Sequence, residues 1–264
     1  MKIKKILVTY TIPLNSEQRK TLETVKKEIQ KTGISFHLCE RTMLDRRCFE
    51  NVDLIIPVGG DGTFLQTSHF VSDSTLFFGV NMDPTHKEGF FMVANRHDFV
   101  KKLDRVLHGL FKIRRLHRLQ AFVDGKKIKE QALNEYYISS KVPYHTARYH
   151  LYVKGKKEMQ KSSGVLVSTA AGSHAWVKSA GGKVLPVFSE KFEFVVREPY
   201  YGRTAKKCHL RQGLLSKHNK ISIIFELFEG IIIADSTAKE HTFMPGQKVE
   251  VTMSKYPISV VAFK

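Results

Sequence analysis

The chain has 264 residues, of which 42% are hydrophobic and 26% are charged. These proportions exclude an intrinsically disordered chain, and no apolar run has the length that a membrane-spanning helix needs. The 43 basic and 25 acidic residues give a net charge of +18. Such a charge attracts polyanions in general, so it does not separate nucleic acids, anionic membranes and phosphorylated metabolites.

Strand-like and helix-like segments alternate in the first part of the chain. The N-terminal run is basic and then apolar, but its apolar core is too short for a signal peptide, so we expect a first strand and a cytoplasmic protein. Strands are expected at 5–10, 34–38, 52–58 and 75–80, and helices at 15–31 and 96–108. This alternation predicts a doubly wound α/β domain over residues 1–110.

The pattern of the sequence changes after Gly109, from alternating strands and helices to short strand-like runs. Asp124-Gly125 and Lys154-Gly155 are hairpin signals, and short alternating apolar runs follow them to the C-terminus. We therefore expect a mainly antiparallel β domain over residues 111–264. Whether its last strand returns to the first domain stays open.

The three cysteines are Cys39, Cys48 and Cys208, and their spacing matches no metal-binding motif. We expect them to be reduced, without a disulfide, as in a reducing compartment. The histidines are scattered as well, so no protein metal site is expected.

A glycine-rich turn, Gly59-Gly60-Asp61-Gly62-Thr63, follows the third expected strand directly. Glycines let the backbone turn sharply and let a phosphate approach the peptide N–H groups. Residues 63–71 would begin a helix whose N-terminus favours anions. An acidic residue in a phosphate cradle is repulsive unless it holds a cation or performs chemistry. Asp61 is therefore a candidate general base, which accepts the proton of an attacking hydroxyl during phosphoryl transfer.

The alternative is an ordinary strand-to-helix turn in which Asp61 caps the helix. The spacing disfavours two common phosphate-binding motifs, because it is not G-x-G-x-x-G and it lacks the lysine of a P-loop.

The turn resembles a signature shared by NAD kinases, diacylglycerol and sphingosine kinases, and phosphofructokinases. Three further segments resemble NAD kinase motifs in the same order: Gly79-Val80-Asn81 with Gly89-Phe90-Phe91, Leu133-Asn134-Glu135, and the glycine- and serine-rich stretch 164–182. The chain is thus similar to the NAD kinase family from residue 50 to its end. Residues 81–85, 168–172 and 196–199 resemble the NADH-preferring branch known from plants.

This resemblance implies an NAD(H) kinase that uses ATP, accompanied by Mg²⁺, to phosphorylate the 2′-hydroxyl of the adenosine ribose of NAD or NADH, giving NADP(H). Asp61 would be the general base. Gly60, Gly62 and Thr63 would receive phosphate, with Phe64 beside the adenine, while Asn134 and Glu135 would bind the ribose and the adenine edge. The segment with Thr169, Ala171, Gly172, Ser173, Ala175 and Trp176 would wrap the nicotinamide half. The family commonly forms dimers and tetramers, so we expect a homo-oligomer with no nucleic-acid or membrane partner.

Three departures from the family pattern stand out. Ser163 replaces an aspartate, His174-Ala175-Trp176 replaces Thr-Ala-Tyr, and Ala234-Asp235-Ser236 stands where the family has Asp-Gly. The first two lie in the nicotinamide half, so contacts and redox preference there stay open. Asn134-Glu135 could also be simple surface pairing, and Trp176 could equally be a core residue.

Two other functions compete with this interpretation. A lipid kinase could share the glycine turn, although such enzymes usually carry Asn-Glu after the threonine, where this chain has Phe64-Leu65-Gln66. A non-catalytic module that binds dinucleotides or nucleic acid would fit the +18 charge and Ser163.

Overall fold

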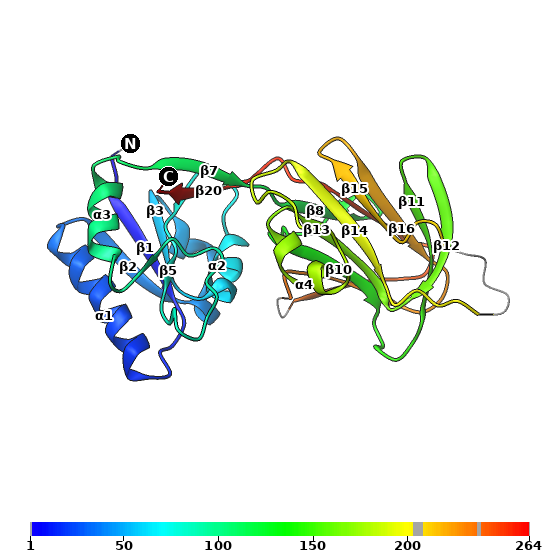
Figure 1. Ribbon diagram of the computed structural model, residues 1–264, viewed down its shortest axis with the longest axis horizontal. Helices are drawn as coiled ribbons and strands as arrows, with labels where there is room; N and C mark the ends of the chain where they lie inside the picture. The colour runs from blue at the N-terminus through cyan, green and yellow to red at the C-terminus, as the bar shows by residue number, and fades with distance from the viewer. Residues whose placement is uncertain (1, 203–207, 237–238, 264) are drawn as a thin grey trace. The chain divides into compact units, whose positions relative to one another are not determined.

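The structure is a computed structural model that describes residues 2–202, 208–236 and 239–263. The chain forms two compact units (Figure 1). Unit 1 contains residues 1–115 and 257–264, and unit 2 contains residues 116–256. The chain therefore leaves unit 1 once and returns to it with its last strand.

Unit 1 is built on a mostly parallel sheet. Its strands are β1 (Lys5–Tyr10), β2 (Ser35–Glu40), β3 (Leu54–Gly59), β4 (Leu76–Phe77), β5 (Val80–Asn81), β6 (Ala94–Asn95), β7 (Lys112–Leu116) and β20 (Ile258–Ala262). Its helices are α1 (Ser16–Lys31), α2 (Asp61–Ser68) and α3 (Phe99–Leu107), and the short 3₁₀ turns are η1 (Arg41–Met43) and η2 (Arg46–Phe49).

The strand order in this sheet is β2-β1-β3-β4-β20-β7, with β5 pairing with β3 and β6. β1 pairs in parallel with β2 on one side and with β3 on the other. The order of the strands therefore reverses between β1 and β3. In open α/β sheets, ligands bind at such a reversal, outside the carboxyl ends of the strands.

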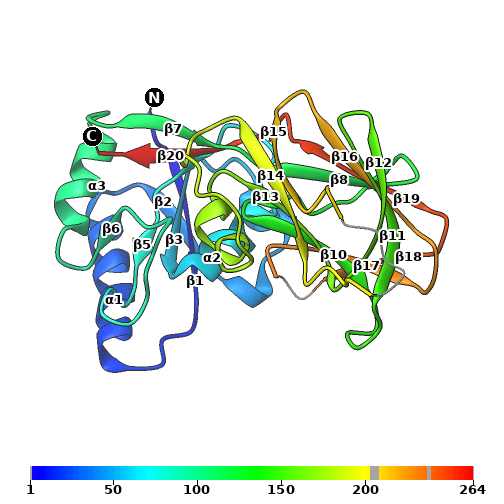
Figure 2. The ribbon, with the colours of Figure 1, turned by 45° about the vertical axis from the view of Figure 1, so that its right-hand side comes forward.

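Helices cover both faces of the sheet (Figures 1 and 2). Apolar residues of α1, such as Val25, and of α3, such as Phe99, share one core with strand residues such as Ile56. On the other face, Thr67 of α2 hydrogen-bonds the hydroxyl of Thr9 in β1 at 2.8 Å. The prediction of a doubly wound α/β domain is confirmed.

The expected strand 75–80 is divided into β4 and β5. The division lies at Gly79, whose carbonyl accepts the backbone N–H groups of Val93 and Ala94. A side chain at Gly79 would lie 2.7 Å from the sulfur of Met92. The backbone therefore approaches the neighbouring segment too closely for a residue other than glycine.

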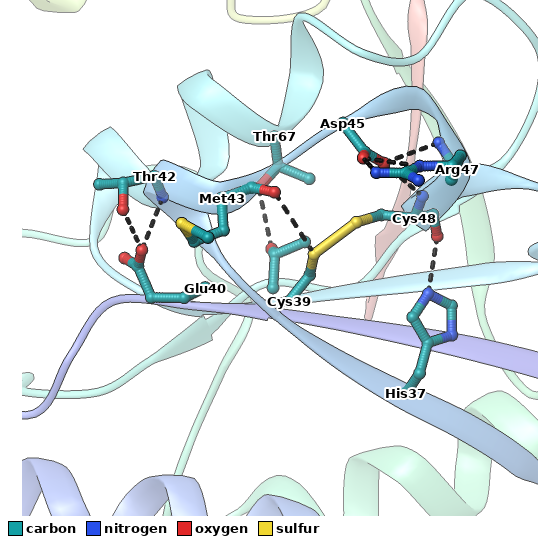
Figure 3. The surroundings of a disulfide bond; sticks show 10 residues. His37, Cys39, Glu40, Thr42, Met43, Asp45, Arg47, Cys48 and Thr67 are labelled. Atoms are coloured by element: carbon teal, nitrogen blue, oxygen red, sulfur yellow. Dashed lines mark hydrogen bonds and ion pairs between the residues drawn. A yellow bond between two sulfur atoms is a disulfide. The ribbon is translucent and has the colours of Figure 1, made fainter.

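A disulfide joins Cys39, at the end of β2, to Cys48 in η2 (Figure 3). The expectation that all cysteines are reduced is thus wrong for this pair. The two turns η1 and η2 fold the chain back on itself, so that the two Cα atoms lie 6.9 Å apart. Sequence spacing alone does not reveal such a return. The closed loop contains Arg41.

Unit 2 consists of two antiparallel six-stranded sheets, which can be followed in Figure 2. The first has the order β15-β14-β13-β10-β17-β18 and the second β12-β11-β16-β19-β8-β9. The strands are β8 (Leu119–Val123), β9 (Lys126–Lys127), β10 (Glu135–Ser140), β11 (Ala147–Val153), β12 (Lys156–Ser162), β13 (Gly164–Thr169), β14 (Lys191–Arg197), β15 (Gln212–Ser216), β16 (Lys220–Phe225), β17 (Gly230–Ala234), β18 (Glu240–Phe243) and β19 (Lys248–Met253). The 3₁₀ turn η3 (Gly172–His174) and the short helix α4 (Trp176–Ser179) follow β13.

One hydrophobic core fills unit 2 and takes side chains from both sheets, for example Val167 from the first and Leu151 from the second. Both predicted hairpins are present, β8–β9 and β11–β12. Their turn residues all have positive φ, which is what tight hairpin turns require. The expected antiparallel β domain is therefore confirmed as a fold class. Within the described ranges, no helix combines the length and apolar character needed to cross a membrane.

Candidate functional site

The residues Gly59–Thr63, called the glycine turn below, connect β3 to α2. A side chain at Gly59 would overlap that of Thr63, so this position accepts only glycine. Gly60 is the extended N-cap of α2, and its carbonyl accepts the N–H groups of Thr63 and Phe64 at 2.9 and 3.3 Å. The N–H groups at the very start of a helix have no partner within the helix and carry the positive end of its dipole. The turn therefore presents backbone donors at the reversal of the strand order.

Two cationic side chains from other segments flank the glycine turn. A Cβ built at Gly62 would lie 3.4 Å from Nη1 of Arg41, and one built at Gly60 would lie 3.0 Å from Cδ of Lys87. Neither Arg41 nor Lys87 forms an ion pair with an acidic group in the described part of the chain. Two positive charges that lack an acidic partner thus lie beside the backbone donors, an arrangement suited to phosphate.

Asp61 is the first residue of α2, and its carboxylate is turned toward the loop after β5. Its two oxygens accept the backbone N–H groups of Phe90 and Phe91 at 3.1 and 2.9 Å, one bond each. An ionised carboxylate has about four acceptor positions, so each oxygen keeps capacity for a further hydrogen bond. The two amides hold the group in one orientation at the edge of the turn.

Phe64 lies one residue beyond the glycine turn. Its ring is fully buried in the structure and packs against Phe77 and Phe91, with ring centres 5.1 and 5.0 Å away. The ring therefore packs α2 against the segment whose amides bind Asp61. It is not accessible from the glycine turn.

In unit 2, the segment before β10 is anchored by a carboxylate from a distant strand end. Asp235 follows β17, and its oxygens accept the N–H groups of Leu133, Asn134 and Glu135 at 2.8, 2.6 and 3.2 Å. Asp235 itself has positive φ and is 6% exposed. Three consecutive backbone donors are thus fixed by one side chain, which sets where Asn134 and Glu135 point.

The stretch 169–176 wraps around the same segment. The hydroxyl of Thr169 donates to the Leu133 carbonyl at 2.6 Å and accepts the Gly172 N–H at 2.9 Å. A side chain at Gly172 would overlap the Asn134 carbonyl, so the close approach of the two backbones depends on glycine. The hydroxyl of Ser173 bridges the Ala170 carbonyl and the Leu185 N–H.

Ala171 is buried in this stretch, and the N–H of Ala175 donates to the Gly172 carbonyl at 2.8 Å. Thr169 and Gly172 therefore lie against Leu133 and Asn134, whereas the bonds of Ser173 and Ala175 hold the stretch itself in shape.

A pocket of about 320 Å³ opens beside this stretch. Its lining residues are Glu135, Tyr137, Trp176, Ile233 and Ser236, and we call it the aromatic pocket. The rings of Tyr137 and Trp176 touch, with their centres 5.0 Å apart. Burial, together with the nearby negative charge of Asp235, raises the pKa of the Glu135 carboxyl to about 8. At neutral pH the acid of this pocket is therefore mostly protonated.

Glu135 has one buried carboxyl oxygen without a hydrogen-bond partner in the described structure. Burying such an oxygen is costly unless something else satisfies it. A protonated carboxyl can both donate and accept a hydrogen bond, so a hydroxyl-bearing ligand would suit it.

Sequence reasoning gave no site role to five residues in or beside these two sites: Arg41, Lys87, Tyr137, Arg197 and Asp235. Arg41 and Lys87 reach the glycine turn from other segments of unit 1. Arg197 lies at the end of β14, and its guanidinium stacks on the ring of Trp176, which lines the aromatic pocket. Tyr137 lies two residues after Glu135 in β10, so strand alternation could have marked it. No local pattern marks the other four, because only tertiary packing brings them to the sites. In the described residues, no group of three or more His, Cys, Asp or Glu could hold a metal ion.

Two family models match the chain. The ATP-NAD kinase N-terminal domain matches residues 4–111, and the ATP-NAD kinase C-terminal domain matches residues 133–263. The matched segments contain the glycine turn and the aromatic pocket, respectively.

Individual proteins show the same likeness. The chain is 28% identical to a probable NADH kinase of Oryza sativa subsp. japonica, over 92% of this chain and 81% of that protein. It is 32% identical to an NAD kinase of Methanosarcina barkeri, over 84% of this chain and 78% of that protein. A crystal structure of an NAD kinase from Archaeoglobus fulgidus in complex with ATP superimposes with a TM-score of 0.79 at 23% identity, covering 98% of this chain and 93% of that one. That structural likeness is one of fold.

Proposed function

This chain belongs to the ATP-NAD kinase family, and from that premise we propose how it works as an NAD(H) kinase. It transfers the terminal phosphoryl group of ATP to the 2′-hydroxyl of the adenosine ribose of NAD or NADH, which gives NADP(H). The observation that supports this most is Asp61, a carboxylate held by two amides inside an anion-binding turn.

Asp61 acts as the general base in this proposal. A sugar hydroxyl is a weak nucleophile at neutral pH, and a carboxylate within hydrogen-bond reach raises the rate by about 10²–10⁴. The 2′-oxygen forms a bond to the γ-phosphorus while its proton passes to an oxygen of Asp61. The bond from that phosphorus to the oxygen that bridges it to the β-phosphate breaks, and ADP leaves with the electron pair.

The phosphates of ATP bind at the glycine turn. The backbone N–H groups of Gly60 and Gly62 donate to them, Thr63 closes the turn through its own N–H to the Gly60 carbonyl, and the charges of Arg41 and Lys87 lie beside the turn. Such donors stabilise the charge that develops on the transferred group. Mg²⁺ enters as part of the MgATP substrate, since it prefers phosphate and water ligands over an all-protein cage.

The dinucleotide binds at the residues around the aromatic pocket. Asn134 and the protonated Glu135 hydrogen-bond the adenosine ribose and the adenine edge. Close backbone approach at Gly172 and the hydrogen-bonded frame of Thr169 and Ser173 give this side of the site its shape. Trp176, with Tyr137 behind it, receives the nicotinamide half.

The cellular setting follows from the same proposal. The enzyme works in the cytoplasm, where it contributes to NADP biosynthesis, and it assembles into a homodimer or homotetramer. Neither nucleic acid nor a membrane is a partner. The buried acid and the aromatic rings around the dinucleotide favour a small polar acceptor over a lipid.

A coupled assay tests the proposal. Purified protein is incubated with MgATP and either NAD or NADH, and the product is read with a dehydrogenase that accepts only NADP(H), so that only 2′-phosphorylation is counted. We expect turnover with at least one redox form, and its loss when EDTA removes Mg²⁺. Diacylglycerol replaces the dinucleotide in a parallel reaction, and binding to random DNA is followed at rising salt. Phosphorylation of the lipid instead, or salt-dependent DNA binding without turnover, would overturn the assignment.

A further inference from the structure

Arg197 places a positive charge against two of the aromatic rings that form the wall of the aromatic pocket. It is the last residue of β14, and its guanidinium carbon lies 4.8 Å from the ring centre of Trp176 and 5.4 Å from that of Tyr137. Both rings line the pocket. An aromatic face attracts cations, and here a cation of the protein already covers these rings. The attraction that the rings would offer to a cationic ligand is therefore reduced.

The acidic groups nearby do not cancel this charge inside the pocket. Glu198 pairs with Arg197 at 3.2 Å, but its side chain is 62% exposed, so solvent and salt screen it. Glu135 is mostly uncharged at neutral pH because burial raises its pKa to about 8. Asp235 keeps its carboxylate directed at three backbone N–H groups.

Position 163 also provides no negative charge to offset that of Arg197. Ser163 follows β12 and carries no charge. Its N–H donates to the Arg197 carbonyl at 3.0 Å, and its carbonyl accepts the Tyr137 hydroxyl at 2.7 Å. The residue therefore lies directly beside the stacked arginine and tyrosine. A carboxylate at this position would oppose the guanidinium charge, whereas a serine leaves it unopposed.

The two redox forms of the dinucleotide differ in the charge of the nicotinamide ring, which the proposed function places at Trp176. The nicotinamide ring of NAD carries a positive charge, and the dihydronicotinamide ring of NADH carries none. We propose that Arg197, with Ser163 beside it, makes the site select NADH over NAD by repelling the oxidised ring. This inference rests on the proposed function, in which Trp176 receives the nicotinamide half.

The test is the ratio of kcat/KM for NADH to kcat/KM for NAD, measured on the same enzyme preparation. Loss of stability or of active protein affects both substrates equally, so it cancels in the ratio. We expect the wild type to favour NADH. Arg197→Met, which removes the charge but keeps much of the length, and Ser163→Asp, which adds a carboxylate, should each lower the ratio about tenfold. Arg197→Lys, which keeps the charge, should retain it.

Arg211→Met is the matched control. Arg211 also stacks on an aromatic ring, that of Tyr201 at 5.6 Å, but this ring, unlike those of Tyr137 and Trp176, does not line the aromatic pocket. Its loss should leave the ratio unchanged. Where a variant turns over too slowly, the ratio of the Kd values for NADH and NAD decides in the same way, and a variant that binds neither form contradicts a purely electrostatic role.

A wild-type preference for NAD, or an unchanged ratio in both Arg197→Met and Ser163→Asp, would overturn the inference while leaving the kinase assignment intact. Absence of NADP(H) from either substrate would instead overturn the proposed function.

Discussion

Each unit contains a carboxylate that accepts consecutive backbone N–H groups. In unit 1, Asp61 binds the amides of Phe90 and Phe91, and in unit 2, Asp235 binds those of residues 133–135. Asp235 is 6% exposed and anchors the segment before a strand, whereas Asp61 lies at the start of a helix, in the glycine turn. The same kind of hydrogen bonding thus anchors the backbone in one place and orients the proposed general base in the other.

The comparison predicts that substitution of Asp61 lowers turnover, whereas substitution of Asp235 lowers stability. Asp61→Asn should lower kcat by about 10²–10⁴, because an amide cannot take up the proton of the ribose hydroxyl. Its melting temperature should change little, since the remaining carbonyl oxygen of asparagine can still accept one of the two N–H groups. Steady-state kinetics and a thermal melt on the same sample check both halves of the prediction. A near-normal kcat would contradict the role of Asp61 as a base.

Asp235→Ala should act mainly on stability. It leaves three backbone donors in a buried segment without this partner, and each such loss costs about 1–3 kcal/mol when water cannot replace it. We expect the free energy of unfolding, measured in urea, to fall by roughly 3 kcal/mol or more. A stable variant with lost turnover would show that Asp235, like Asp61, belongs to the reaction.

Glu135→Gln tests the protonation state of the buried acid in unit 2 through the pH dependence of stability. In the unfolded chain this carboxyl ionises near pH 4.5, and in the folded protein near about pH 8. Between these values the folded state holds a proton that the unfolded state has released, so rising pH destabilises the wild type across this window. Glutamine carries no such proton. The variant should therefore gain stability relative to the wild type between about pH 5 and 8, by roughly 3 kcal/mol.

Urea unfolding of both proteins at pH 5.5 and pH 8.5 checks this prediction. A difference between variant and wild type that is the same at both pH values would show that Glu135 is ionised in the folded protein at neutral pH.

Arg41→Ala tests whether the loop closed by the disulfide serves the glycine turn. Removal of a positive charge beside the phosphates should raise KM for ATP about tenfold, with little change in KM for the dinucleotide. Arg47→Ala is the matched control, because Arg47 lies in the same loop but is paired with Asp45 at 2.6 Å and is highly exposed. Equal effects of the two substitutions would indicate a general effect of charge instead of a contact with ATP.

The two regions also differ in how much the sequence reveals. The glycine turn consists of consecutive residues, and the role proposed for it rests on backbone N–H groups, so a short motif suffices to predict the turn and the helix after it. The aromatic pocket takes Glu135 and Tyr137 from β10, Ile233 from β17 and Trp176 from the segment after β13. Their proximity depends on strand register, which no single-sequence pattern specifies.

Other features stayed hidden for the same reason. The disulfide between Cys39 and Cys48 depends on two short turns that fold the chain back. Phe64 follows the glycine turn directly, but its ring points into the core because α2 buries that face against the sheet. Adjacency in sequence predicts which segment a residue belongs to, and the packing of the segment decides where its side chain points.

The most direct test of the central claim is a crystal structure with bound NADH and a non-hydrolysable ATP analogue. We expect a carboxylate oxygen of Asp61 within about 2.6–3.2 Å of the 2′-oxygen of the adenosine ribose, with the γ-phosphate analogue at the glycine turn. An adenosine ribose bound elsewhere, with Asp61 still hydrogen-bonded only to the amides of Phe90 and Phe91, would contradict the proposed mechanism.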